Sequence, residues 1–185
     1  MPRCEERWFC CSDVFYAMKN VETPGVSSEP WPEGDDGDSI GPYQIQKGYW
    51  VDAFRLDQRP NYGTAANPKP PAIPAPGNCI SCGGDVEYPW LADDALGGIP
   101  LSEAVICLYM NRYALNEKRR LQACRGTITD VEKCCRVHNG GPSQRYQSNW
   151  NAATMPRTTR RERLLATIAE GATDYWNKAR RILGC

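Results

Sequence analysis

The sequence has no excess of charge of either sign and no long hydrophobic run. Its 22 Lys and Arg residues balance 22 Asp and Glu residues, so the formal net charge is zero. This balance gives no long-range attraction toward nucleic acid or an anionic membrane, and we expect neither as a partner. The longest apolar run, Ala104 to Met110, is too short to span a bilayer.

A secretion signal is also missing from the first residues. Glu5 and Glu6 stand where a signal peptide has basic residues, and no apolar core follows them. We therefore expect a cytoplasmic protein, or a secreted one if a signal was removed before Met1.

Cysteine is present, but its spacing assigns no site. Ten cysteines in 185 residues fall below the density of a small disulfide scaffold. An even number permits disulfides without fixing their pairing. Cys79 and Cys82 have the spacing of half a zinc ribbon, whereas Cys134 and Cys135 are adjacent and do not supply a second pair. We expect no metal and no cofactor.

Apolar periodicity and capping signals predict an α-rich chain. The predicted helices comprise residues 13–22, a short helix within 41–53, and residues 102–118, 129–138, 159–170 and 173–183. Ser102, Thr129 and Thr159 have the positions of N-caps, the two threonines with a Glu three residues later. Gly171 is expected to separate the last two helices. Prolines exclude regular structure from much of the segment 54–88.

Four short motifs occur in an order that resembles a known family. They are Glu22-Thr23-Pro24-Gly25, Ser39-Ile40-Gly41-Pro42-Tyr43-Gln44-Ile45 with Tyr49-Trp50-Val51-Asp52, Tyr109-Met110-Asn111-Arg112-Tyr113-Ala114, and His138-Asn139-Gly140-Gly141-Pro142 followed by Tyr175-Trp176. Together they resemble the invertebrate-type (i-type) lysozyme, or destabilase, family. The resemblance implies an α-rich (α+β) lysozyme-like fold with a small hairpin or loop region. It implies one domain over residues 12–185, with an N-terminal extension at 1–11 and insertions at about 54–87 and 143–171.

The resemblance also implies a site that cleaves peptidoglycan between its aminosugars. Glycoside hydrolysis needs a protonated carboxyl for the leaving oxygen and an ionised carboxylate across the bond. Glu22 matches the family's acid. Asp35 best fits the second carboxylate, with Asp36 and Asp38 as open alternatives. The motif residues expected to contact substrate are Tyr43, Gln44, His138 and Asn139.

The chain departs from this family in its cysteines. Residues of other types stand at the family's cysteine positions, namely Val14, Ala17, Lys19, Ile40, Ala53, Val105, Thr127 and Val131. Because most of them are small and apolar, we expect core packing in place of the family's disulfides, as suits a reducing compartment.

The sequence is compatible with two candidate functions. The missing signal and the missing disulfide framework favour a non-enzymatic assembly protein: a lysozyme-like domain with protein partners in a cytosolic complex, such as a cytoskeletal or ciliary microtubule assembly. The alternative is an active muramidase that binds and hydrolyses peptidoglycan through Glu22. A net charge of zero argues against the enzyme, because a bacterial wall is polyanionic.

Overall fold

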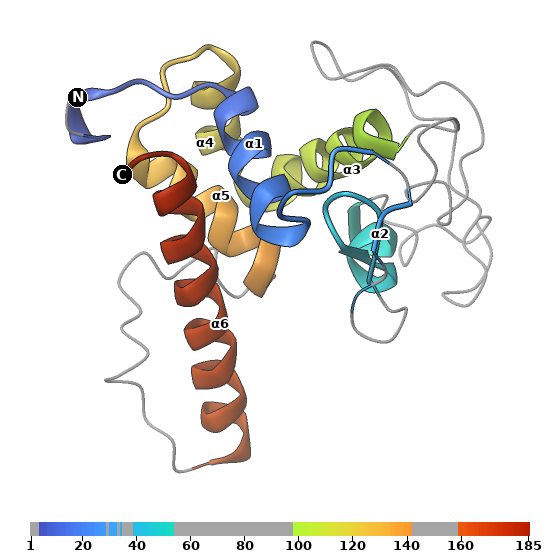
Figure 1. Cartoon of the computed structure of the whole chain (residues 1–185). Helices are drawn as coiled ribbons and strands as arrows, with labels where there is room; N and C mark the ends of the chain where they lie inside the picture. The colour runs from blue at the N-terminus through green and yellow to red at the C-terminus, as the bar shows by residue number, and fades with distance from the viewer. Residues whose placement is uncertain (1–3, 29, 33, 35–38, 54–97, 142–158) are drawn as a thin grey trace. The chain divides into compact units, whose positions relative to one another are not determined.

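The computed structural model describes residues 4–28, 30–32, 34, 39–53, 98–141 and 159–185. These residues form mostly helices and a small antiparallel sheet, which confirms the α-rich prediction (Figure 1). The chain divides into two compact units: Met1–Val21 with Tyr113–Cys185, and Glu22–Arg112. The predicted insertion at 54–87 and most of the one at 143–171 lie outside the described residues. None of the described helices is long and apolar enough to cross a membrane.

The first unit is built from helices. They are the 3-10 helix η1 (Cys4–Glu6), most of α1 (Cys11–Glu22), α4 (Leu115–Gln122), α5 (Ile128–Gly140) and α6 (Arg160–Ile182). Helix α5 packs against both α4 and α6 (Figure 1). Buried apolar side chains from each of these long helices form the core, among them Val14, Met18, Leu121, Val131, Val137, Ala169 and Ala172.

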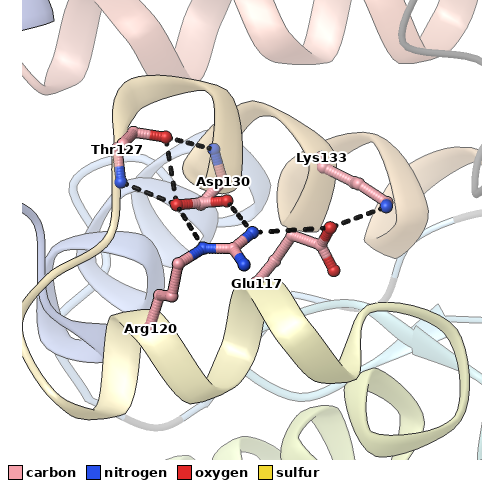
Figure 2. A network of polar contacts seen from close by, with 5 residues as sticks. All are labelled: Glu117, Arg120, Thr127, Asp130 and Lys133. Carbon is pink, nitrogen blue, oxygen red and sulfur yellow. Dashed lines mark hydrogen bonds and ion pairs between the residues drawn. The ribbon is translucent and has the colours of Figure 1, made fainter.

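The start of α5 lies slightly earlier than predicted. Thr127, and not Thr129, is the N-cap: its hydroxyl accepts the backbone N–H of Asp130, whose carboxylate accepts the Thr127 N–H in return. Asp130 therefore takes the place in the capping box that the sequence suggested for Glu132. Arg120 of α4 donates two hydrogen bonds to Asp130, and Glu117 pairs with Lys133, so charged contacts join α4 to α5 (Figure 2).

Helix α6 runs without a break through Gly171, so the predicted separation of two helices is wrong. Gly171 has no positive φ and is exposed, and only Asn139 Oδ1, at 3.8 Å, would lie near an added Cβ. The buried alanines on either side, Ala169 and Ala172, continue one apolar face of the helix. Packing along this face outweighs the lower helix propensity of one glycine, about 1 kcal/mol.

The second unit contains strands β1 (Ser39–Ile40) and β2 (Ile45–Gln46), helix α2 (Lys47–Ala53) and most of helix α3 (Gly98–Tyr113). The strands pair antiparallel, with Ile40 opposite Ile45. The short helix predicted within 41–53 is confirmed: it is α2. The helix predicted at 102–118 is instead two helices, because Ala114 (φ −145°) interrupts it before α4. Ser102 is buried inside α3 and is not its cap.

Small apolar residues fill several positions where the resemblance to i-type lysozymes would place cysteine. Val14, Ala17, Ala53, Val105 and Val131 are all buried. The prediction of core packing at these positions is confirmed for these five residues.

Other cysteines are cross-linked, at positions whose pairing the sequence left open. Disulfides join Cys4 to Cys185 and Cys10 to Cys124. Next to the Cys10–Cys124 disulfide in sequence, Phe9 pairs with Gly126 through backbone hydrogen bonds of 2.9 and 3.1 Å. Residues 4–10, which lie within the N-terminal extension predicted at 1–11, are thus cross-linked to the rest of the first unit. Cys107 of α3 is also disulfide-bonded.

Candidate functional site

Glu22 is the last residue of α1, as the sequence predicted. The helix begins where the Asp13 carboxylate accepts the backbone N–H of Cys10 at 2.8 Å. It ends at Thr23-Pro24-Gly25, where Pro24 cannot continue a helix and Gly25 adopts a φ of +76°. The Glu22 side chain is half-buried. A carboxyl is thereby held at the C-terminal end of a twelve-residue helix.

A hydrogen bond joins the Glu22 motif to the second motif. Thr23 is fully buried, and its hydroxyl donates to the backbone carbonyl of Pro42 at 3.0 Å. Nineteen residues separate the two in sequence. The first two motifs of the resemblance therefore meet directly beside Glu22.

The second motif forms a tight turn between β1 and β2. Gly41 (φ +77°) begins it, and the Gln44 N–H closes it on the Gly41 carbonyl at 3.1 Å. The Gln44 side chain also donates to the carbonyls of Gly41 (2.9 Å) and Pro32 (2.5 Å). The amide hydrogens of Gln44 therefore organise the loop, and a substrate contact for this residue stays a prediction.

Gln44 also lies against Gly34, which precedes the acidic residues. An added Cβ on Gly34 would stand 2.2 Å from Gln44 Oε1, so a larger residue there would displace the Gln44 side chain. Gly34 and Ser39 exchange backbone hydrogen bonds of 3.1 and 3.2 Å. Asp35, Asp36 and Asp38 lie between this pair in sequence but outside the described residues.

Tyr43, expected to contact substrate, is buried and donates its hydroxyl to Glu103 of α3 at 2.7 Å. Burial raises the pKa of Glu103, and the hydrogen bond from Tyr43 only partly opposes this. Burial and the nearby Glu103 charge raise the pKa of Tyr43 far above its usual value. Glu103 is absent from the residues expected at the site. The signal for it in the sequence is that it is the charged residue in an otherwise uncharged stretch, 101–110.

The second and third motifs also contact each other. The rings of Tyr49 and Tyr109 stack with centroids 3.7 Å apart. Arg112 forms an ion pair with the Asp52 carboxylate and donates to the Asp52 carbonyl at 3.2 Å. Helix α2 is thus fastened to α3 within the second unit.

The fourth motif belongs to the first unit. His138 is buried at the end of α5, and its ring centroid lies 6.0 Å from that of Tyr175 on α6. The Tyr175 hydroxyl donates to the carbonyl of Met18 at 3.4 Å. Asn139 is exposed. The expected residues are therefore divided: His138 and Asn139 lie in one unit, and the other three described residues, Glu22, Tyr43 and Gln44, lie in the other.

Among the residues that the structure describes, no group of three or more His, Cys, Asp and Glu side chains has the arrangement of a metal site. Comparison of the chain with protein-family models, with curated proteins and with solved structures finds no match.

Proposed function

We propose that the chain is a lysozyme-like glycoside hydrolase that cleaves peptidoglycan, with Glu22 as the general acid. The observation that carries this proposal is the Thr23–Pro42 hydrogen bond at 3.0 Å. It brings together, next to a half-buried glutamate, two sequence motifs that the resemblance assigns to one catalytic site. The lysozyme-like fold of the whole chain is part of the same proposal.

The position of Glu22 suits a carboxyl that must carry a proton. The C-terminal end of a helix bears a partial negative charge, which disfavours a second negative charge there. Partial burial of Glu22 acts in the same direction, because desolvation disfavours the charged form. Protonated Glu22 would donate to the glycosidic oxygen as the bond from that oxygen to the sugar carbon breaks.

The second carboxylate in this proposal is Asp35, with Asp36 and Asp38 as the alternatives. Its ionised form would stabilise positive charge at the sugar carbon or attack it. Water then supplies hydroxide to the sugar carbon, and the remaining proton returns to Glu22. The pairing of Gly34 with Ser39, braced by Gln44, supports this assignment because it fixes both ends of the acidic segment.

The disulfides favour the enzyme over the cytosolic assembly protein. Disulfides persist in oxidising compartments and are rare in the cytosol. Cys4–Cys185 and Cys10–Cys124 therefore support a secreted protein, the alternative location that the sequence left open. They weaken the argument for a reducing compartment, which rests on the missing family disulfides.

The test is hydrolysis of purified peptidoglycan by the wild-type chain and its Glu22→Gln variant. The amide keeps the size of the side chain and cannot donate the catalytic proton, so we expect a loss of at least about 100-fold. Glu6→Gln, at an exposed glutamate of η1, is the matched control and should retain full activity. Equal activity of Glu22→Gln and the wild type would contradict the assignment.

A second candidate, the non-enzymatic assembly protein, is favoured by two exposed aromatic side chains. Trp8 is 65% exposed and Tyr16 is 60% exposed, and both lie in the first unit. Exposed aromatic residues are enriched at protein interfaces. A folded wild type without any hydrolytic activity would favour this candidate, with a cytoskeletal or ciliary microtubule assembly as its proposed setting.

A further inference from the structure

Glu103 is not among the site residues predicted from the sequence. In the structure, Glu103 contacts Tyr43 of the second motif. Its carboxylate accepts the Tyr43 hydroxyl at 2.7 Å. Tyr43 is 1% exposed, and Glu103 of α3 is half-buried. A carboxylate in such surroundings is expensive to keep ionised. The hydrogen bond from the Tyr43 hydroxyl offsets part of this cost.

A short chain of bonds runs from Glu103 to Glu22 within the second unit. Glu103 holds Tyr43, which is covalently joined to Pro42. The Pro42 carbonyl accepts the Thr23 hydroxyl, and Thr23 follows Glu22 directly. Only two hydrogen bonds separate the two carboxyl groups along this path, and the residues that make them, Thr23 and Tyr43, are buried.

We propose that Glu103 is a positioning residue for the hydrolytic reaction. By holding Tyr43, it holds the turn that contains Pro42. The Pro42 carbonyl in turn holds Thr23, and thereby the position of Glu22. This inference rests on the proposed function. The contact that carries this role is the hydrogen bond from the Tyr43 hydroxyl to the Glu103 carboxylate. Its contribution lies in the alignment of Glu22, and misplacement of a catalytic group by about 1 Å can reduce a rate about 100-fold.

The experiment compares kcat and KM for peptidoglycan fragments in the wild type, Glu103→Leu, Glu103→Gln and Tyr43→Phe. Leucine removes the acceptor, whereas the glutamine amide oxygen still accepts the Tyr43 hydroxyl. Phenylalanine removes the same hydrogen bond from the other side and keeps the ring. We expect kcat to fall about 10- to 100-fold in Glu103→Leu and Tyr43→Phe, with KM within about 2-fold, and recovery to within about 3-fold in Glu103→Gln.

The double variant Glu103→Leu/Tyr43→Phe tests whether both changes act through one bond. If they do, it is no slower than the worse single variant. Thermal unfolding of each variant identifies any that does not fold, and Tyr43→Phe provides the test if Glu103→Leu fails to fold.

The outcomes separate the inference from the function on which it rests. If the wild type is active, Glu22→Gln is inactive, and both Tyr43→Phe and folded Glu103→Leu keep kcat within about 2-fold, the positioning role is overturned while the proposed function stands. If the folded wild type hydrolyses nothing, the proposed function is overturned, and the positioning role with it.

Discussion

At the scale of single residues, the position of Glu22 depends on Thr23. Its buried hydroxyl has a partner in the Pro42 carbonyl, 3.0 Å away. Thr23→Val keeps the shape of the side chain and leaves that carbonyl without this donor, which costs about 1 to 3 kcal/mol for a buried polar group. We expect a loss of stability of this size in urea unfolding, together with a lower kcat. Thr129→Val, at an exposed threonine of α5, should change stability by less than about 0.5 kcal/mol. Equal effects of the two substitutions would contradict the role of Thr23.

Asp130 should make the stability of the protein sensitive to acid. Burial alone would raise the pKa of Asp130, but hydrogen bonds from Arg120 and Thr127 outweigh it and hold the pKa below its usual value. A carboxyl whose pKa is lower in the folded state stabilises the fold above its unfolded pKa, about 3.9, and loses this contribution as the pH falls through the folded pKa. Figure 2 shows the contacts on which this depends.

The test of this pH dependence is urea unfolding of the wild type and Asp130→Asn at about pH 7 and about pH 2.5. At neutral pH we expect the variant to be less stable by about 1 to 3 kcal/mol, toward the lower value because Arg120 is 47% exposed. At the acid pH the difference should shrink toward zero. Asp174→Asn, at an exposed position on α6, serves as the control. A difference that stays constant or grows at low pH would show that Asp130 does not act through its charge.

At the scale of helices and strands, the sequence was informative wherever periodicity and turn residues agreed. Helix α1 and its stop at Thr23-Pro24-Gly25, the short helix α2 and the end of α5 near Gly140 all follow from such local signals. Where tertiary packing decides, local signals fail. Ser102 looks like a cap but is buried inside α3, and Gly171 looks like a stop but lies within α6.

In the candidate site, too, some residues could be predicted from local sequence patterns and others depend on tertiary contacts. Glu22 could be placed from its motif, because the helix that ends there has a local signature. The partnership of Tyr43 with Glu103 spans 60 residues, and no pattern within either segment specifies it. The cysteine pairs could not be predicted either, since spacing allows many pairings and only the fold brings Cys4 near Cys185.

Gly171→Ala tests the continuity of α6. Since the position is helical and nearly open around an added Cβ, alanine should stabilise the protein by about 0.5 to 1 kcal/mol and raise Tm by about 1 to 4 °C. Gly184→Ala makes the same change where φ is +73°, and should destabilise by about 1 kcal/mol because only glycine adopts that conformation easily. Calorimetry of both variants measures these changes in Tm. Destabilisation by Gly171→Ala would mean that the helix breaks there.

At the scale of the whole molecule, disulfides tie the ends of the chain into the first unit. Cys4–Cys185 closes a separation of 181 residues and Cys10–Cys124 one of 114. Each such cross-link typically stabilises a protein by about 2 to 4 kcal/mol. We therefore expect Cys10→Ala/Cys124→Ala to unfold at lower urea concentration than the wild type.

Peptide mapping after alkylation under denaturing, non-reducing conditions checks the disulfide state directly. Cys4, Cys10, Cys107, Cys124 and Cys185 should resist alkylation until a reductant is added, whereas the buried thiols Cys134 and Cys135 should react at once. Alkylation of all ten cysteines without reductant in protein purified from its native source would place it in a reducing compartment and revive the assembly candidate.

The most direct test of the account is the release of new reducing sugar ends from purified peptidoglycan, with the product identified by mass spectrometry. We predict that the wild-type chain releases fragments that end in an aminosugar and carry one added water per bond cleaved, and that Glu22→Gln releases none above background. A folded, disulfide-bonded wild type that releases no such ends would contradict the assignment of Glu22 as a glycosidase acid.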